Sequence, residues 1–378
     1  MSAPFTGLTW DHPRGFQALE AAARANGPVH WETHPLEGFE SAPVAELCER
    51  YDLIVLDHPH LGEAVSSGCL IPLDQILEDN DLQRIATSSV GLSYASYQYQ
   101  GHQWALPLDA ATQVMAARTD LMTTAVPETW EQVIALSQTQ GGVALALAGP
   151  HALLSLLSIA AALDPKADLR EGDRWIDAAV SCEAIKILAT LASHSPPSIQ
   201  ALNPIGMLEH MTTSDDVRMC PLVYGYVNYA NPTLSRALSF LDAPRLSSGA
   251  SPGSILGGTG IAISRHCKFD DTLREHLLWL LSDSAQTDFI PQQAGQPSAL
   301  KSWRDPQLNQ RWNGFYANTL HTLRHASIRP RHNGYIAFQT QASARLREGL
   351  EGGVSEHRLA QDLTTLFERS HRDQGRKN

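Results

Sequence analysis

Positively charged residues are too few for a chain whose main partner is a polyanion. The 378 residues include 28 Lys and Arg against 40 Asp and Glu, which gives a formal net charge of −12. Nucleic acids and anionic membranes attract proteins with an excess of cationic side chains, so we expect neither as the main partner. Charged residues make up only 18% of the chain and hydrophobic residues 43%, which excludes a disordered chain.

Cysteine is also scarce, and its spacing suggests no pairing. The five cysteines are Cys48, Cys69, Cys182, Cys220 and Cys267, and no two of them form a CxxC motif. The spacing gives no support to a zinc ribbon, a thioredoxin-like redox motif or a disulfide framework. We therefore predict that all five are free thiols.

No apolar run is long enough to cross a membrane. The nearest candidate, residues 143–163, is interrupted by Gly149 and Pro150, and it predicts a short buried strand followed by a buried helix. The first eight residues lack the basic start and the apolar stretch of a secretory signal. The sequence as it stands leaves two alternatives, a cytoplasmic protein or a mature form whose leader is replaced by a methionine.

Signatures of known enzyme classes are missing too. The chain has no GxSxG, no HExxH and no Ser/Lys pair in a known spacing, so we predict no catalytic residue. The glycine-rich segment 257–260 lacks the Lys of a P-loop and precedes a strand rather than a helix, which argues against a nucleotide. Apart from His58 and His60, the 16 histidines do not cluster at metal-ligand spacing, and we expect neither a metal nor a cofactor.

Strands and helices are expected to alternate from the N-terminus. The patterns predict strands over 7–10, 29–31 and 52–57 and helices over 16–25 and 41–51. The last strand is an apolar run between two acids, which is typical of a strand buried on both faces. Such βαβ units imply a parallel sheet, and ligands bind these sheets outside the carboxyl ends of the strands. Because a single core rarely exceeds about 250–300 residues, we expect two α/β lobes.

Three local patterns predict further elements. Gln100 and Gly101 are expected to form the turn of a hairpin. Thr129 and Gln132 have the spacing of a capping box at the start of a helix. Asp270 is expected to cap a helix that runs to Leu281.

The tripeptide Asp-His-Pro follows two of the predicted strands. Trp10 precedes Asp11 and His12, and Leu56 precedes Asp57 and His58. If both strands are central and parallel, both loops lie at the same edge of the sheet. One interpretation is a polar cluster for a ligand or a metal. The other is that each Asp caps the next helix and leaves its His exposed. The two interpretations are compatible, because a capped helix N-terminus at a cleft also binds anions.

Two further segments carry candidate ligand contacts. The loop after the strand expected over 217–223 contains Tyr224, Tyr226, Asn228 and Tyr229, whose rings, hydroxyls and amide suit a sugar or an aromatic ring. The alternative is a set of ordinary core aromatics.

The second segment is extended and places Arg329 and Arg331 on the same side, where they suit a carboxylate of the ligand or of the other lobe. A solvated pair beside a helix is the alternative.

Several blocks of the sequence resemble the family 1 extracellular solute-binding proteins of ABC importers, the maltose-binding-protein-like group. The matching blocks, in the order of the family, are YDLI (51–54) with GCLIPLD (68–74), GHQWALP (101–107), RTDL (118–121) with VPETWEQV (126–133), GGTGIAI (257–263) and the loop 293–297. Each block alone is weak, but together they span most of the chain. The resemblance implies the two-lobed periplasmic-binding-protein-like fold, in which each lobe is a mostly parallel sheet flanked by helices and a cleft between the lobes holds the ligand.

The resemblance also implies limits for the lobes. By matched position, the first lobe is about 1–109 plus 255–312 and the second about 113–250 plus 315–378, with hinge crossings near 107–112, 250–255 and 312–315. Family members bind mainly sugars, polyols and other small polar solutes, act as monomers with the permease subunits of an ABC transporter, and lie in the periplasm. A cytoplasmic location stays open here, because no signal peptide is visible.

The leading hypothesis is non-catalytic binding of a sugar, a polyol or a small carboxylate. The predicted ligand-binding residues are Trp10, Asp11, His12, Asp57, His58, Asp109, Tyr224, Tyr226, Asn228, Tyr229, Gly258, Thr259 and Arg331. One alternative is a metal-dependent or acid–base enzyme that uses Asp57, His58 and His60. Another is a cytoplasmic ligand sensor derived from a transporter component.

Overall fold

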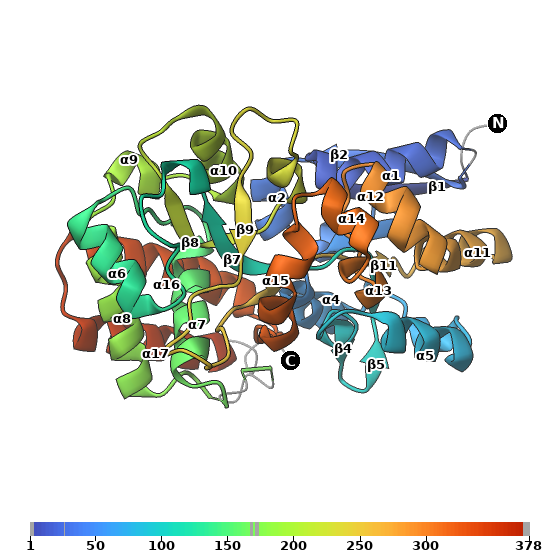
Figure 1. Ribbon diagram of the computed structural model, residues 1–378. Coiled ribbons are helices and arrows are strands. Elements are labelled where there is room, and N and C mark those ends of the chain that lie inside the picture. Colours follow the sequence, from blue (N-terminus) through green and yellow to red (C-terminus); the bar gives the residue numbers. More distant parts are fainter. Residues whose placement is uncertain (1–3, 26, 167–168, 171–173, 373–378) are drawn as a thin grey trace. The chain divides into compact units, whose positions relative to one another are not determined.

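The computed structural model describes residues 4–25, 27–166, 169–170 and 174–372. Its contacts divide the chain into two compact units, each built from separate stretches of the sequence. The first unit comprises the residues up to Ala110, Gly257–Leu308 and Arg331–Asn333. The second comprises Ala111–Leu256, Asn309–Pro330 and the residues from Gly334 onward. The colours in Figure 1 show that the first unit combines the blue start of the chain with an orange segment from its last third.

Three short segments fall in the unit opposite to the expected lobe, and the first of them, residues 255–256, belongs to the second unit. Residues 309–312 belong to the second unit, because the Asn309 backbone and side chain accept hydrogen bonds from Gly314 and Ala317 at the start of the next helix. Residues 331–333 belong to the first unit, where they pack against Gly62 so closely that a Cβ there would lie 2.0 Å from the Arg331 carbonyl oxygen. Residues 1–3 and 373–378 of the expected lobes lie outside the described residues.

The first unit contains a mixed five-stranded sheet in the order β2-β1-β3-β11-β6. Its strands are Phe5–Trp10 (β1), Val29–His34 (β2), Leu53–Leu56 (β3), Ala105–Pro107 (β6) and Gly260–Ile263 (β11). Strand β1 runs parallel to β2 and β3, whereas β11 runs antiparallel to β3 and β6. The expected hairpin is confirmed as β4 (Gln98–Tyr99) and β5 (His102–Gln103), with Gln100 and Gly101 at positive φ in its turn.

Helices cover both faces of this sheet. They are Pro13–Arg24 (α1), Leu36–Ser41 (α2), Val44–Cys48 (α3), Leu61–Ser67 (α4), Asp79–Ser88 (α5), Asp271–Leu280 (α11), Ile290–Gln292 (α12) and Leu300–Trp303 (α13). Leu53 and Val55 of β3 join the core under α1 and α11, whereas Ile54 and Leu56 join the core under α3 and α4. This alternation confirms that β3 is buried on both faces.

Two predicted helices of the first unit have different outcomes. Asp270 caps α11 by accepting a hydrogen bond from the Leu273 amide, as expected. The single helix expected over 41–51 is wrong, because α2 ends at Ser41 and α3 begins after Pro43. Proline lacks an amide hydrogen and disfavours helical backbone in the residue before it, which explains the break.

The second unit contains a sheet in the order β10-β7-β8, with β9 beside β7. Its strands are Ala111–Ala117 (β7), Met219–Tyr224 (β8), Ser239–Leu241 (β9) and Leu256–Gly257 (β10). Strand β7 is antiparallel to β8 and β9, and a bridge from Val143 to Met219 is parallel. The sheets are thus mixed rather than mostly parallel as expected. In the first unit β11 runs antiparallel to its neighbours, and in the second unit β7 does so.

Eight helices of the second unit, and one at the limit of both, lie among the described residues. They are Trp130–Thr139 (α6), His151–Leu163 (α7), Ala178–Ala192 (α8), Pro197–Gln200 (α9), Pro204–Thr213 (α10), Phe315–His325 (α15), Tyr335–Glu351 (α16) and Glu356–Arg372 (α17), with Pro306–Arg311 (α14) at the limit. Helices α7, α8, α16 and α17 pack together around the largest apolar core (Figure 1). The capping box at Thr129 and Gln132 is confirmed. No described helix is both long and apolar enough to span a membrane.

Candidate functional site

Both Asp-His-Pro loops emerge at the same edge of the first unit's sheet. Strands β1 and β3 are neighbours and parallel, with Gly7 opposite Leu53 and Leu8 opposite Ile54, so the predicted adjacency of the two loops is confirmed. Strand β11 runs the other way, and Gly260 pairs with both Leu56 and Pro107, which brings the residues around 258 and 109 to this edge. We call this group the polar edge; it consists of Trp10, Asp11, His12, Asp57, His58, Asp109, Gly258 and Thr259.

In the first loop the histidine, not the aspartate, caps the helix. The His12 Nδ1 atom accepts a hydrogen bond from the Arg14 amide at 3.1 Å, and Pro13 is the first residue of α1. His12 is buried, so the expectation of an exposed histidine is wrong here, while Asp11 is exposed. Burial, helped by the Arg14 charge, lowers the pKa of His12 to about 4, so its imidazole is neutral at pH 7.

Trp10, just before this loop, packs inside the unit. Its side chain is 2% exposed, and its ring centre lies 5.2 Å from that of Phe39. A Cβ on Gly15 would lie 2.4 Å from the indole, so the first turn of α1 rests directly on the ring. Among the described residues, none accepts a hydrogen bond from the buried Trp10 Nε1. Trp10 therefore supports the loop. Its indole N–H donates to no described residue.

In the second loop the aspartate is the cap. The Asp57 Oδ1 atom accepts a hydrogen bond from the His58 amide at 2.9 Å, and it lies 3.1 Å from the His58 Nδ1. His58 is fully buried, again against expectation, with its ring edge-on to Tyr97 at 6.4 Å between centres. The Tyr97 hydroxyl donates to the carbonyl oxygens of Leu56 at 3.1 Å and Gly258 at 3.4 Å. Tyr97, which the sequence did not single out, thus joins the second loop to the glycine-rich segment.

The Asp109 carboxylate is held by a buried ion pair with Arg14. Arg14 Nε lies 2.6 Å from one carboxylate oxygen and Nη2 lies 2.8 Å from the other, with both side chains 4% exposed. The Thr259 amide donates to the same carboxylate at 3.0 Å. A small hollow beside the pair is lined by these two side chains, Trp10, Gln296 and apolar residues. No local sequence pattern indicates this pair, because its members lie 95 positions apart.

The two arginines after α15 hold different groups of the protein. Arg331 lies in the first unit, where its Nη1 donates to the carbonyl oxygens of Ala95, Ser96 and Gln98. Its guanidinium carbon lies 5.6 Å from the centre of the Tyr99 ring. Arg329 lies in the second unit and donates to Gln339 at 3.2 Å. Both arginines are buried, so the alternative of a solvated pair is wrong.

The tyrosine loop of the second unit follows β8 directly. Tyr224 ends that strand with its ring 6.0 Å from the His151 ring, and Tyr226 is 5% exposed. The short helical turn Val227–Ala230 then carries Asn228 and Tyr229, both half-buried. The Tyr229 hydroxyl lies 3.5 Å from a Glu209 oxygen, and burial together with the Glu209 charge raises the pKa of Tyr229. The predicted meeting of this loop with the polar edge stays a prediction.

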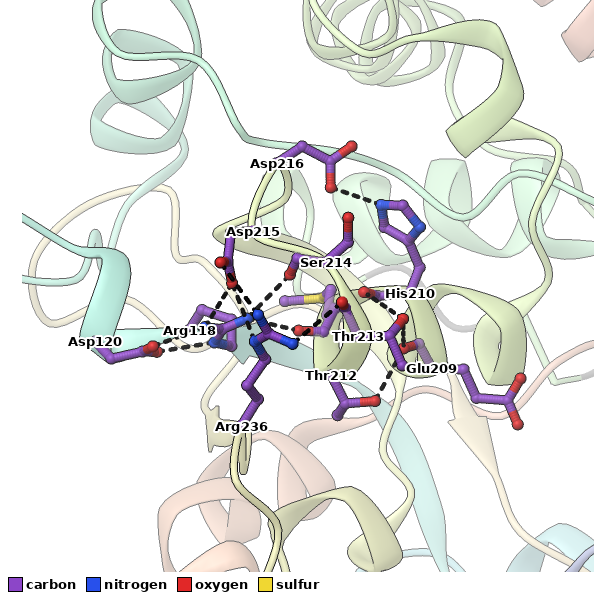
Figure 2. A network of polar contacts seen from close by, with 11 residues as sticks. Arg118, Asp120, Glu209, His210, Thr212, Thr213, Ser214, Asp215, Asp216 and Arg236 are labelled. Carbon is purple, nitrogen blue, oxygen red and sulfur yellow. Dashed lines mark hydrogen bonds and ion pairs between the residues drawn. The ribbon is translucent and has the colours of Figure 1, made fainter.

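A polar network elsewhere in the second unit has a structural role. Figure 2 shows the buried Arg118 guanidinium in contact with Asp120 and Asp215, and Arg236 reaches the same Asp215 carboxylate. Arg118 also donates to the carbonyl oxygens of Met211 and Ser214, so its five N–H groups make five hydrogen bonds. The bonds to Arg118 lower the pKa of Asp120. This network ties the end of β7 to the loop after α10, and it includes Arg118 and Asp120 of the RTDL block.

Metal coordination finds no support in the described part of the chain. Within it, no three His, Cys, Asp or Glu side chains come together in a way that could hold a metal ion. His60, the third residue of the enzyme alternative, is buried like His58.

The chain belongs to a family of bacterial extracellular solute-binding proteins. Residues 48–315, well over half of the chain, match the model of this family, which confirms the resemblance read from the sequence blocks. No curated protein matches the chain in sequence.

Solved structures with the same fold are numerous. An ABC transporter solute-binding protein from Agrobacterium radiobacter K84 in complex with ribitol has 18% identity and a TM-score of 0.78, over 97% of this chain and 98% of that one. One from Agrobacterium vitis S4 with bound D-mannitol has 16% identity and a TM-score of 0.71, over 98% and 99%. Maltose-bound MalE3 of T. maritima has 14% identity and a TM-score of 0.77, over 96% and 98%. These likenesses confirm the predicted two-lobed α/β fold class.

Proposed function

We propose that this protein binds a small sugar or polyol without changing it and delivers it to the permease subunits of an ABC importer. The observation that carries the proposal is the polar edge, where two adjacent parallel strands end in Asp-His loops at the edge where α/β sheets bind ligands. Family membership supports the same conclusion. The relatives that hold ribitol, D-mannitol and maltose make polyhydroxylated solutes the first class to test.

The charges at the polar edge favour hydroxyl groups over carboxylates. Asp11 and Asp57 can accept hydrogen bonds from solute hydroxyls. They would repel an anion, while Asp109 is already neutralised by Arg14. His12 offers no compensating positive charge, because its pKa is lowered to about 4. We therefore favour a sugar or a polyol over a small carboxylate as the solute.

The tyrosine loop supplies a second set of proposed contacts. Tyr226 and Tyr229 present rings that suit the apolar faces of a sugar, and Asn228 offers both a donor and an acceptor. Gly258 and Thr259 complete the proposed set at the polar edge, where Gly258 has no side chain to block the approach of a solute. Trp10 and Arg331, which pack inside the first unit, are assigned a supporting role.

The proposal contains no catalytic step. His58 and His60 are both buried, so neither is placed as an exposed acid or base. We propose that the protein acts as a monomer in the periplasm, in keeping with the extracellular family. The net charge of −12 argues against a nucleic acid as partner.

A ligand screen tests the proposal directly. Thermal shifts are measured with sugars, polyols and small carboxylic acids, and solutes that raise the melting temperature are then titrated by calorimetry and recovered for mass analysis. We expect a sugar or a polyol to bind and to be recovered unchanged. Turnover of the bound solute, or binding of carboxylic acids alone, would overturn it.

Two variants test the assigned contacts. Tyr226→Ala should cost about 1–3 kcal/mol of affinity if its ring and hydroxyl are buried against the solute. Combining it with Asp57→Ala should weaken binding further. His30→Ala, an exposed position on β2, serves as the matched control that leaves affinity unchanged. Unchanged affinity in the double variant would remove both loops from the site.

A further inference from the structure

All five cysteines are free thiols in the structure, as predicted, but two of them lie in contact in the first unit. The Cys48 and Cys69 sulfur atoms are 3.1 Å apart, although 21 positions separate the residues in the sequence. Cys48 is the last residue of α3 and is 3% exposed, whereas Cys69 follows α4 and is half-buried. The two sulfurs need to approach by only about 1 Å to reach the length of a disulfide bond, roughly 2.05 Å.

Backbone contacts hold the two cysteines in this position. Gly68 ends α4 at a φ of 66°, a left-handed conformation that turns the chain back over the helix. The Cys69 amide then donates to the Ala64 carbonyl at 3.3 Å, and the Cys69 carbonyl accepts from the Arg265 amide at 2.8 Å. Cys48 is part of the apolar core on this face of the sheet. The thiol contact therefore joins two well-anchored segments.

We propose that Cys48 and Cys69 form a disulfide bond when the protein meets a disulfide oxidant, such as oxidised glutathione or an oxidised thiol–disulfide oxidoreductase. The Cys69 thiolate attacks one sulfur of the oxidant's disulfide and releases the other as a thiolate. The Cys48 thiol loses its proton and attacks the Cys69 sulfur, which releases the second thiolate of the oxidant. The two cysteines lose two electrons and two protons, and the oxidant becomes two thiols.

The surroundings give the two thiols different parts in this exchange. The thiol of Cys48 donates a hydrogen bond to the Cys69 sulfur, and this bond lowers the pKa of Cys69 to about 7. The same bond, together with burial, raises the pKa of Cys48. The half-buried Cys69 is thus the attacking thiol, and the buried Cys48 closes the bond.

The other three cysteines lack this arrangement. Burial raises the pKa of Cys220 and of Cys267 to about 12, and it also raises the pKa of Cys182. In the part of the chain that the structure describes, no second sulfur contacts any of these three. The extracellular family to which the chain belongs supports an oxidising compartment, where disulfides persist.

The bond would enclose part of the polar edge in a covalent ring. The ring runs from Cys48 to Cys69 and includes β3, Asp57, His58 and α4. A cross-link of this span restricts the unfolded chain, and we expect it to raise the melting temperature of the first unit by roughly 5–10 °C. Because the second Asp-His-Pro loop lies inside this ring, the disulfide would restrict its motion directly.

Thiol counting and peptide mapping test the proposal on the whole protein. The reduced protein is freed of reductant, treated with oxidised glutathione and denatured, and its thiols are then titrated. We expect three thiols in place of the five of the reduced chain, with a linked peptide pair that contains Cys48 and Cys69. Five remaining thiols, a stable glutathione adduct on Cys69, or a cross-link between other cysteines would overturn the proposal.

Two variants separate the pair from general oxidation. Cys69→Ser should retain four thiols after oxidation and show no difference in melting temperature between reduced and oxidised samples. Cys182→Ser, on α8 in the second unit, should still form the cross-link and show the full difference. If Cys69→Ser fails to fold, the peptide map of the unaltered protein by itself shows whether Cys48 and Cys69 are linked. A difference in melting temperature that persists in folded Cys69→Ser contradicts the proposal.

Discussion

The two Asp-His-Pro loops use the same three residues in different ways. In the first, His12 caps α1 and Asp11 is left exposed, whereas in the second, Asp57 caps the turn and His58 is buried against Tyr97. The first loop leads into a helix of 12 residues, and the second into a three-residue helical turn before α4. In both loops the tripeptide starts a helical segment. The packing around each loop decides which of its side chains stays available to a ligand.

The largest expected effect comes from the ion pair that anchors the first loop. Asp109→Ala removes the carboxylate that neutralises the buried Arg14, and we expect a loss of about 3–5 kcal/mol in the free energy of unfolding. Urea denaturation measures it. Asp11→Ala, an exposed position three residues before Arg14, is the matched control, with an expected change within about 0.5 kcal/mol. Equal stability of the two variants would show that the pair does not anchor the loop.

Affinity for the solute tests whether Asp11, like Asp57, contacts the ligand. Asp11 makes no cap, so Asp11→Ala should lower affinity by about 1.5–3 kcal/mol, the range of a hydrogen bond to a charged group, while the free energy of unfolding stays unchanged. Calorimetry with the solute found in the screen, beside urea denaturation, measures both quantities. Full affinity in Asp11→Ala would limit the ligand contacts of the polar edge to the second loop.

The pH dependence of stability tests the buried state of His12. Its pKa is about 4 in the folded protein and about 6.5 in the unfolded chain, so between these values the unfolded chain binds more protons. Stability therefore falls as pH falls through this window, by about 1–2 kcal/mol from pH 7 to pH 5. His12→Asn keeps a capping acceptor but cannot titrate, so its stability should fall less over the same range. Parallel pH profiles for both proteins would contradict the burial of His12.

The smallest effect concerns the helix cap itself. His12→Ala removes the acceptor for the Arg14 amide, and we expect a loss of about 1 kcal/mol in the free energy of unfolding at pH 7. His12→Asn should recover most of it, because an amide oxygen can accept the same hydrogen bond. If Asp11→Ala lowers the free energy of unfolding more than His12→Ala does, Asp11 rather than His12 caps the helix.

Several elements could be predicted because their causes are local. The apolar run from Leu53 to Leu56 is long enough only for a strand, and both of its faces are buried. Gly101 readily adopts the positive φ that a tight hairpin turn needs. The helix expected over 41–51 failed because the pattern of apolar residues was given more weight than Pro43, which ends one helix and starts another.

The candidate site was predictable only in part. The two loops could be placed at one edge because parallel neighbouring strands end together. The ligand contacts expected for Asp109 and Arg331 stay predictions, but the partners of these two side chains were not foreseen: Arg14 holds the Asp109 carboxylate, and Arg331 donates to backbone carbonyls around Tyr97. Neither partner is near in sequence, so no local pattern could reveal either contact.

The sequence by itself determined the α/β class, the strands that carry the loops, and the family, because these depend on apolar periodicity, turn residues and the order of short blocks. Only the tertiary structure decided which members of the loops are buried, which charges are neutralised, and that Cys48 meets Cys69. The physical reason is that hydrogen bonds, ion pairs and thiol contacts act over a few ångströms in space. Residues 21 or 95 positions apart come that close only when the whole unit has folded.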